Sequence, residues 1–224
     1  MKIFHEFFYY RFGRLPFSFA LKFNVMNEKK STRELNLVLI PLAIALNIGI
    51  GSLVNALKLP FYLDAVGTVL ITILLGLAPG IITGVMSFVL ITAFGLNPYA
   101  IYFVGTQAVI AVFTHFVASK SGFKNLWRTI FSGIGLGIVC ALVSAPVIVF
   151  LFGGIEANGP GFVTAFLVKA GKTIYQSVIL KGVSIEPIDK TLQCLLAVYL
   201  IRSLPASVLQ RFASPSLTKN NFIK

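Results

Sequence analysis

Few side chains in this sequence could carry out chemistry, and their spacing forms no recognisable catalytic set. There are seven acidic residues and two histidines, His5 and His115, without a Ser/His/Asp arrangement or metal-ligand spacing among them. The segment Gly171-Lys172-Thr173 ends like a phosphate-binding loop, but Phe166 stands where that loop needs its first glycine. We therefore expect no enzymatic activity, no nucleotide hydrolysis, no metal and no cofactor in this chain.

The most distinctive polar residue is Asp64, which lies at the boundary of an apolar stretch within the segment 59–68. An acid carried to the centre of a bilayer costs on the order of 2.5–3.5 kcal/mol. We therefore expect Asp64 to lie in water, beside a cation, or at a helix N-terminus, where the helix dipole favours negative charge. A structural role at the helix start and a binding role are both open, and the two are compatible.

The composition places these residues in a membrane. Hydrophobic residues make up 57% of the 224 residues and charged residues 12%, against roughly 45–50% and 25% in soluble domains. No hydrophilic stretch is long enough to fold into a soluble domain. The sequence predicts an all-α integral membrane protein.

Six apolar segments are predicted to span the membrane, namely 36–57, 63–77, 80–94, 99–119, 129–152 and 187–204. Ala78-Pro79-Gly80 is expected to break the chain between the second and third. The segment Phe162–Lys181 has a helical pattern with three lysines, and we expect it to lie along the surface rather than span. The predicted organisation is a basic, aromatic N-terminal segment at 1–34, a membrane domain at 35–211 and a cytoplasmic tail at 212–224, with Met26 as an alternative start.

The net charge of +12 arises from lysines and arginines that flank apolar spans, so it indicates membrane topology rather than nucleic-acid binding. With six spans, fourteen basic residues share the side that carries both termini, provided that 162–181 does not cross. The remaining five are Lys58, Lys169, Lys172, Lys181 and Lys190. Because lysines and arginines are enriched on the cytoplasmic side of membrane proteins, this count predicts both termini in the cytoplasm, with the N-terminal segment contacting membrane lipids.

Small residues mark two faces of the first span. Ala43, Asn47, Gly51 and Asn55 recur every four residues, and Ala45 and Gly49 form a pair on an adjacent face. Such faces allow another helix to approach closely. Whether that helix belongs to this chain or to another protein is open.

Two stretches resemble substrate-binding S components of energy-coupling factor (ECF) transporters. The run from Pro60 to Thr68, continued by Leu75–Gly80 and Gly84, looks like their second and third helices, and Glu186-Pro-Ile-Asp-Lys190 is similar to the start of the last helix. The resemblance implies a six-helix bundle in a bacterial plasma membrane. It also implies binding of a vitamin or vitamin precursor from outside, and delivery inward on a transmembrane coupling protein driven by two ATP-binding cassette ATPases.

The resemblance also implies site residues. Docking on the coupling protein maps to Ala45 and Gly49, with glycine in place of the usual second alanine. The ligand site maps to the outer ends of the helices, at Phe61, Tyr62, Asp64, Asn97, Tyr99, Tyr102, Gln107, Asn158, Asp189 and Lys190. Such a set suits a small ring compound, although Tyr99 and Tyr102 also suit an interfacial aromatic belt. The alternative is a membrane sensor or scaffold that binds without transport.

Overall fold

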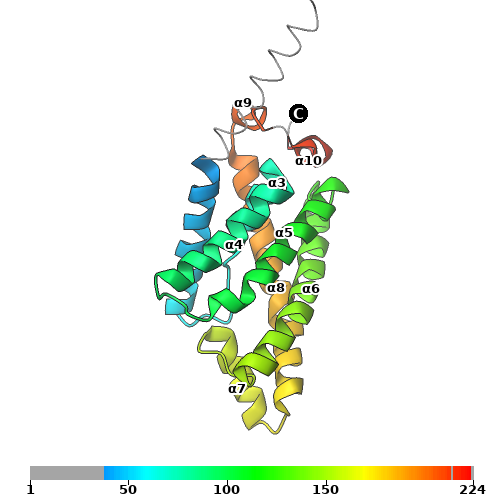
Figure 1. Cartoon of the computed structure of the whole chain (residues 1–224). Coiled ribbons are helices and arrows are strands. Elements are labelled where there is room, and N and C mark those ends of the chain that lie inside the picture. The colour runs from blue at the N-terminus through cyan, green and yellow to red at the C-terminus, as the bar shows by residue number, and fades with distance from the viewer. Residues whose placement is uncertain (1–37, 213, 223–224) are drawn as a thin grey trace, which may run out of the picture.

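The computed structural model describes residues 38–212 and 214–222, and these residues fold into helices without strands (Figure 1). The predicted N-terminal segment 1–34 and the alternative start at Met26 lie outside the described residues.

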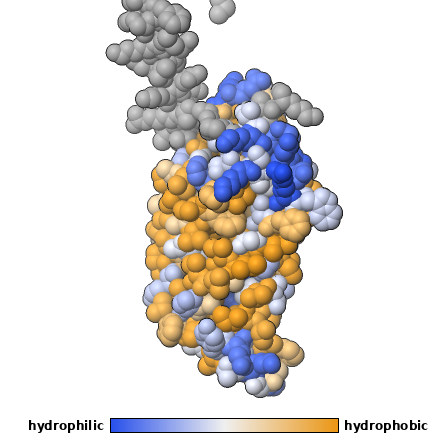
Figure 2. All heavy atoms as spheres, turned by 90° about the vertical axis from the view of Figure 1, so that its right-hand side faces the viewer, coloured by the Kyte–Doolittle hydropathy of each residue, from blue (hydrophilic) through white to orange (hydrophobic). Residues whose placement is uncertain are grey.

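Among the described residues, three helices are long and apolar enough to cross a membrane. They are Val38–Ala56, which we call the first helix because it is the first in the described residues, Ala100–Ser119 and Leu126–Phe152 (α6). The second consists of a 3₁₀ turn, η1 (Ala100–Phe103), followed by α5 (Val104–Ser119). The 27 residues of α6 reach about 40 Å, beyond a hydrocarbon core of about 30 Å. Figure 2 shows the matching surface, an apolar band between two hydrophilic ends, so the protein is an α-helical membrane protein.

The second and third predicted spans form a short hairpin, α3 (Val66–Leu75) and α4 (Leu77–Ala93). The break falls at Gly76, with φ of 98°, and not at 78–80 as predicted. Pro79 lies in the first turn of α4, where a missing backbone N–H is tolerated. Eight of the ten residues of α3 are buried, and ten residues reach only about 15 Å. The helix α3 is thus an interior element of the bundle.

The region after α6 differs from the predicted segments 162–181 and 187–204. The chain forms α7 (Gly159–Lys169) and then a 30-residue helix, α8 (Ile174–Ser203), which continues through Pro187. Gly171, with φ of 90°, turns the chain between them, and Thr173 forms a capping box with Gln176. The segment 162–181 is therefore not one surface helix, and its second half is the start of α8.

Glycines on α6 bring α8 into close contact. A Cβ at Gly133 would overlap the backbone of Thr191, and one at Gly137 would overlap the backbone of Glu186 and Pro187. These two glycines therefore allow α6 and α8 to pack closely. Because Glu186 lies at the contact, this close approach also fixes the position of the part of α8 that carries Glu186.

The segment 212–224, predicted to be a tail, packs against the bundle over its described residues. It contains α10 (Pro215–Lys219), which follows the short helix α9 (Ala206–Leu209). The amide of Asn220 donates to the carbonyl of Ala118 at 2.8 Å and accepts from the backbone N–H of Phe123 at 2.8 Å. Leu217 is fully buried beside them. The described part of this segment therefore belongs to the fold and covers the end of α5 and the turn that follows it.

The basic residues of the described chain gather at the end that carries Val38 and α10, which is uppermost in Figure 1. This end holds the α5–α6 turn and the end of α8, with Lys120, Lys124, Arg128, Arg202, Arg211 and Lys219. The opposite end carries Lys58, Lys169 and Lys172. Lys181 and Lys190, assigned to that side from the sequence, are instead buried within the bundle. We call the two ends the basic end and the opposite end.

Replacing Gly137 tests the close approach of α6 and α8. In Gly137→Ala the new methyl group overlaps the backbone of α8, so we expect the free energy of unfolding in detergent to fall by about 1–3 kcal/mol. Gly105→Ala is the matched control, because a Cβ there meets nothing within 4 Å and alanine favours the helix. Equal melting temperatures for the two variants would contradict the packing role.

Candidate functional site

A cavity of about 110 Å³ lies inside the bundle, toward the opposite end. Its apolar wall consists mainly of Phe61, Phe88, Ile91, Phe103, Ile110 and Ile148. Its polar wall includes Asn55, Tyr62, Asp64, Gln107, Glu186 and Lys190. A largely apolar space with a few converging polar groups is typical of sites for small molecules.

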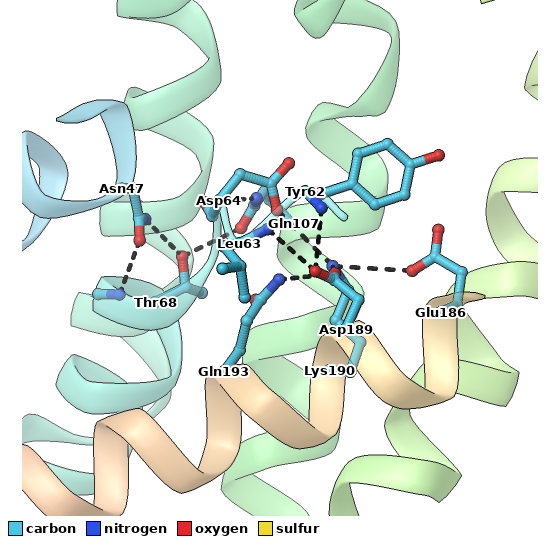
Figure 3. A network of polar contacts seen from close by, with 11 residues as sticks. Asn47, Tyr62, Leu63, Asp64, Thr68, Gln107, Glu186, Asp189, Lys190 and Gln193 are labelled. Atoms are coloured by element: carbon cyan, nitrogen blue, oxygen red, sulfur yellow. Dashed lines mark hydrogen bonds and ion pairs between the residues drawn. The ribbon is translucent and has the colours of Figure 1, made fainter. Parts of the chain in front are cut away.

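The linker between the first helix and α3, residues 57–65, is held against the cavity by Asp189. One carboxylate oxygen of Asp189 accepts from the backbone N–H groups of Tyr62 and Leu63, each at 3.0 Å. The other accepts from Nζ of Lys190 and Nε2 of Gln193, each at 2.7 Å (Figure 3). Asp189 is fully buried and lies behind the cavity wall, so it positions the linker.

Asp64 and Glu186 face the same lysine from two elements. Nζ of Lys190 lies 3.6 Å from Oδ1 of Asp64 and 3.7 Å from Oε2 of Glu186, beyond hydrogen-bonding distance. Burial raises the pKa of Asp64 above its ordinary value, and the nearby Lys190 opposes this shift. Asp64 precedes α3 by two residues, and the first turn of α3 holds no acid. Of the surroundings expected for Asp64, the structure shows a position beside a cation, Lys190.

A second buried ion pair lies beside the cavity. Nζ of Lys181 lies 2.7 Å from Oε2 of Glu156 and donates to the hydroxyl of Tyr62 at 3.1 Å. Burial and then the negative charge of Glu156 raise the pKa of the Tyr62 hydroxyl well above its usual value. That hydroxyl therefore keeps its proton and can act as a donor at the cavity wall.

A polar network connects the inner side of the cavity to the first helix. Asn47 donates to Thr68 and Ser87, each at 3.0 Å, and accepts from the backbone N–H of Gly67 at 2.7 Å. Thr68 donates to Gln107 at 3.0 Å, and Gln107 donates to the carbonyl of Asp64 at 3.3 Å. The network joins four helices and fixes the amide of Gln107 toward the linker.

The structure buries one of the two small-residue faces of the first helix and leaves the other exposed. A Cβ at Gly67 would overlap the carbonyl of Ala43, and Ala43 and Asn47 are buried, so the face containing them packs inside the chain. Ala45 and Gly49 are exposed, and a Cβ at Gly49 would meet nothing within 4 Å. The alternative left open by the sequence is thus resolved for the first face.

An outer pocket of about 730 Å³ adjoins the cavity. The two share the lining residues Asn55, Leu96, Asn97, Phe103, Glu156 and Asn158. Tyr99 and Tyr102 also line the outer pocket and pack edge-on against Phe152, with ring centroids 5.3 and 5.5 Å away. Both tyrosines are 53% exposed. The loops 94–99 and 153–158 thus form an entrance to the cavity.

No family model, curated protein or solved structure matches this chain. A functional assignment consequently rests on the residues gathered at the cavity.

The structure brings most of the predicted ligand residues together. Those that line the cavity are Phe61, Tyr62, Asp64, Asn97, Gln107, Asn158 and Lys190. Tyr99 and Tyr102 line only the outer pocket, and Asp189 lines neither. The side-chain oxygen of Asn158 also caps α7 by accepting from the backbone N–H of Gly161 at 2.8 Å. This oxygen therefore has a structural role.

The sequence analysis missed Glu156 and Glu186 as site residues. Glu186 lies four residues before Lys190 on α8, and this spacing places the two on one helix face, a signal that could have identified it. Glu156 lies in a turn-rich segment with no periodicity, and it reaches Lys181 only through the tertiary fold. No local pattern could have identified Glu156.

Removing the charge of Asp189 should release the linker. In Asp189→Asn the one remaining oxygen can accept either from the two linker N–H groups or from Lys190 and Gln193, and the amide NH₂ then faces the other pair of donors. We expect a loss of about 3–5 kcal/mol in the free energy of unfolding, as for a broken buried ion pair. We also expect faster trypsin cleavage after Lys58. Unchanged melting and cleavage would contradict this positioning role.

Proposed function

We propose that this chain is the membrane-embedded substrate-specificity (S) subunit of an ECF transporter. It binds a vitamin or vitamin precursor and delivers it inward when docked on a separate coupling protein and two ATP-binding cassette ATPases. The observation that carries the proposal is the cavity, in which seven of the ten ligand residues implied by the resemblance meet. These residues come from three separate loops or turns and from α5 and α8.

The distribution of charge supports an orientation. Lysines and arginines flanking membrane helices are enriched on the cytoplasmic side, so the basic end is assigned to the cytoplasm. Both termini are then cytoplasmic, and the cavity and its outer pocket open toward the outside of a bacterial plasma membrane. In this arrangement the six helices of the S component are Val38–Ala56, α3, α4, the η1–α5 unit, α6 and α8.

The exposed face of the first helix supports a docking role. Ala45 and Gly49 lie on it between the large apolar side chains of Leu42 and Leu53, which are also exposed. A flat strip of small residues lets a helix of another protein approach closely in a membrane. We assign this strip to the contact with the coupling protein.

A sensor or scaffold that binds without transport is the second candidate. The same cavity supports it, because binding alone does not require a coupling protein. Co-purification with a coupling protein and ATPases distinguishes the two functions.

Blocking the cavity tests the binding function. We expect mass spectrometry of small molecules released from the purified protein to find a stoichiometric vitamin-like compound after growth in rich medium. Thr106 lines the cavity, so Thr106→Phe should lose the compound because the ring fills the space. Gly105→Phe on the exposed side of α5 should retain it. A compound retained by both variants, or absent from the folded wild type after growth with added vitamins, would contradict the proposal.

Enlarging the small-residue strip tests the transport function. In Gly49→Leu the new side chain fills the notch where another helix would lie. We expect co-purification with the coupling protein to fall at least about tenfold, as for a loss of 1.4 kcal/mol or more. Release of the bound compound on denaturation should be unchanged. Gly105→Leu, at another exposed glycine, should retain the complex. Equal co-purification of the two variants would place the docking surface elsewhere.

A further inference from the structure

The charges around the cavity are unbalanced. Four buried or partly buried carboxylates, Asp64, Glu156, Glu186 and Asp189, surround only two amines, those of Lys181 and Lys190. Each amine is nearly fully buried and makes one short ion pair, Lys181 with Glu156 and Lys190 with Asp189, both at 2.7 Å. Two of the four carboxylates therefore have no short ion pair with an amine.

Asp64 and Glu186 are these two carboxylates, and both line the cavity. Oδ1 of Asp64 and Oε2 of Glu186 are buried and have no hydrogen-bond partner among the described residues. Glu186 is 5% exposed. Both atoms lie near Nζ of Lys190, at 3.6 and 3.7 Å, but too far away to accept a hydrogen bond from it. A buried polar atom without a hydrogen-bonding partner is unfavourable, so these atoms are suited to receiving donors from a ligand.

A third unpartnered atom has the same character. Oδ1 of Asn55 is buried, lines the cavity and has no partner in the described part of the chain. All the unpartnered buried side-chain atoms that border the cavity are thus oxygens, and a ligand must supply the N–H or O–H groups. The rest of the wall, with Phe61, Phe88 and Phe103, suits an apolar ring.

The entrance has a matching character. Glu156, already paired with Lys181, is the one charged residue that lines the outer pocket within the described chain. Tyr99 and Tyr102 present aromatic rings there, and the faces of such rings attract cations. No lysine or arginine in the described chain lines the entrance to attract an anion.

We infer that the cavity selects a compact ring compound carrying a positively charged, N–H-donating group, which hydrogen-bonds to Glu186, Asp64 and Asn55. This inference rests on the proposed binding function and specifies its substrate class. Neutral analogues lose the charge-assisted hydrogen bonds, and anionic analogues meet the two surplus carboxylates.

Three probes of the same shape test the inference, namely benzamidine (cationic), benzamide (neutral) and benzoate (anionic). Their binding to the ligand-free wild type in detergent is measured by calorimetry at neutral pH. We expect benzamidine to bind most tightly, with a Kd at least about tenfold below that of benzoate.

Two variants connect the preference to its residues. Glu186→Gln should weaken benzamidine at least about tenfold while leaving benzamide within about threefold. Asn55→Asp adds a carboxylate at the same wall and should tighten benzamidine. Size-exclusion chromatography checks that each variant is folded, and Asn55→Asp decides the outcome if Glu186→Gln aggregates.

The outcomes separate the two proposals. If benzoate or benzamide binds the wild type as tightly as benzamidine, and Thr106→Phe abolishes that binding, the cation preference is wrong and the binding function stands. Absence of benzamidine binding at millimolar concentration also overturns the cation preference. If in addition no compound is released from the purified protein, the binding function fails as well.

Discussion

The carboxylate of Asp189 is the interaction on which the rest of the site depends. It is fully buried, yet it accepts four hydrogen bonds, two from the linker backbone and two from α8. Without it, Lys190 would lose its short ion pair and the linker would lose its attachment to α8. Asp64 and Tyr62 reach the cavity because this carboxylate fixes the backbone beside them. A single charge inside an apolar bundle thus organises both the wall and the charge balance of the site.

Close helix packing makes this arrangement possible. Gly137 allows the backbone of α8 to approach α6 at Glu186 and Pro187, and Gly67 allows α3 to approach the first helix at Ala43. Both contacts lie next to polar side chains that must meet across the bundle. Because hydrogen bonds require separations near 3 Å, a displacement of one methyl group at either contact would disrupt the networks. The small residues therefore serve the polar site as well as the packing of the helices.

The sequence predicted the long helices well, because long uncharged apolar runs have few alternatives in a membrane. It failed where tertiary contacts override local signals. Pro187 was expected to begin a helix, but α8 passes through it, and the α3–α4 break follows the positive φ of Gly76 rather than Pro79. Lys181 was expected at the surface, whereas Glu156, distant in sequence, neutralises it in the interior. The resemblance pointed to residues of the linker and of α8 that line the cavity, such as Asp64 and Lys190, whereas no local pattern pointed to Glu156.

The cap formed by α10 has a consequence for the order in which the fold can be completed. Ser216 donates to the carbonyl of Ile73 at 2.7 Å, across 143 residues of sequence. Asn220 satisfies groups at the α5–α6 turn that are about a hundred residues earlier. Until translation has passed these positions, the C-terminal end of α3 lacks its partner at the basic end. During synthesis the carbonyl of Ile73, at the end of the buried helix α3, therefore lacks this donor. Ribosome-stalled chains that end before and after α10 would differ in how accessible that end of α3 is.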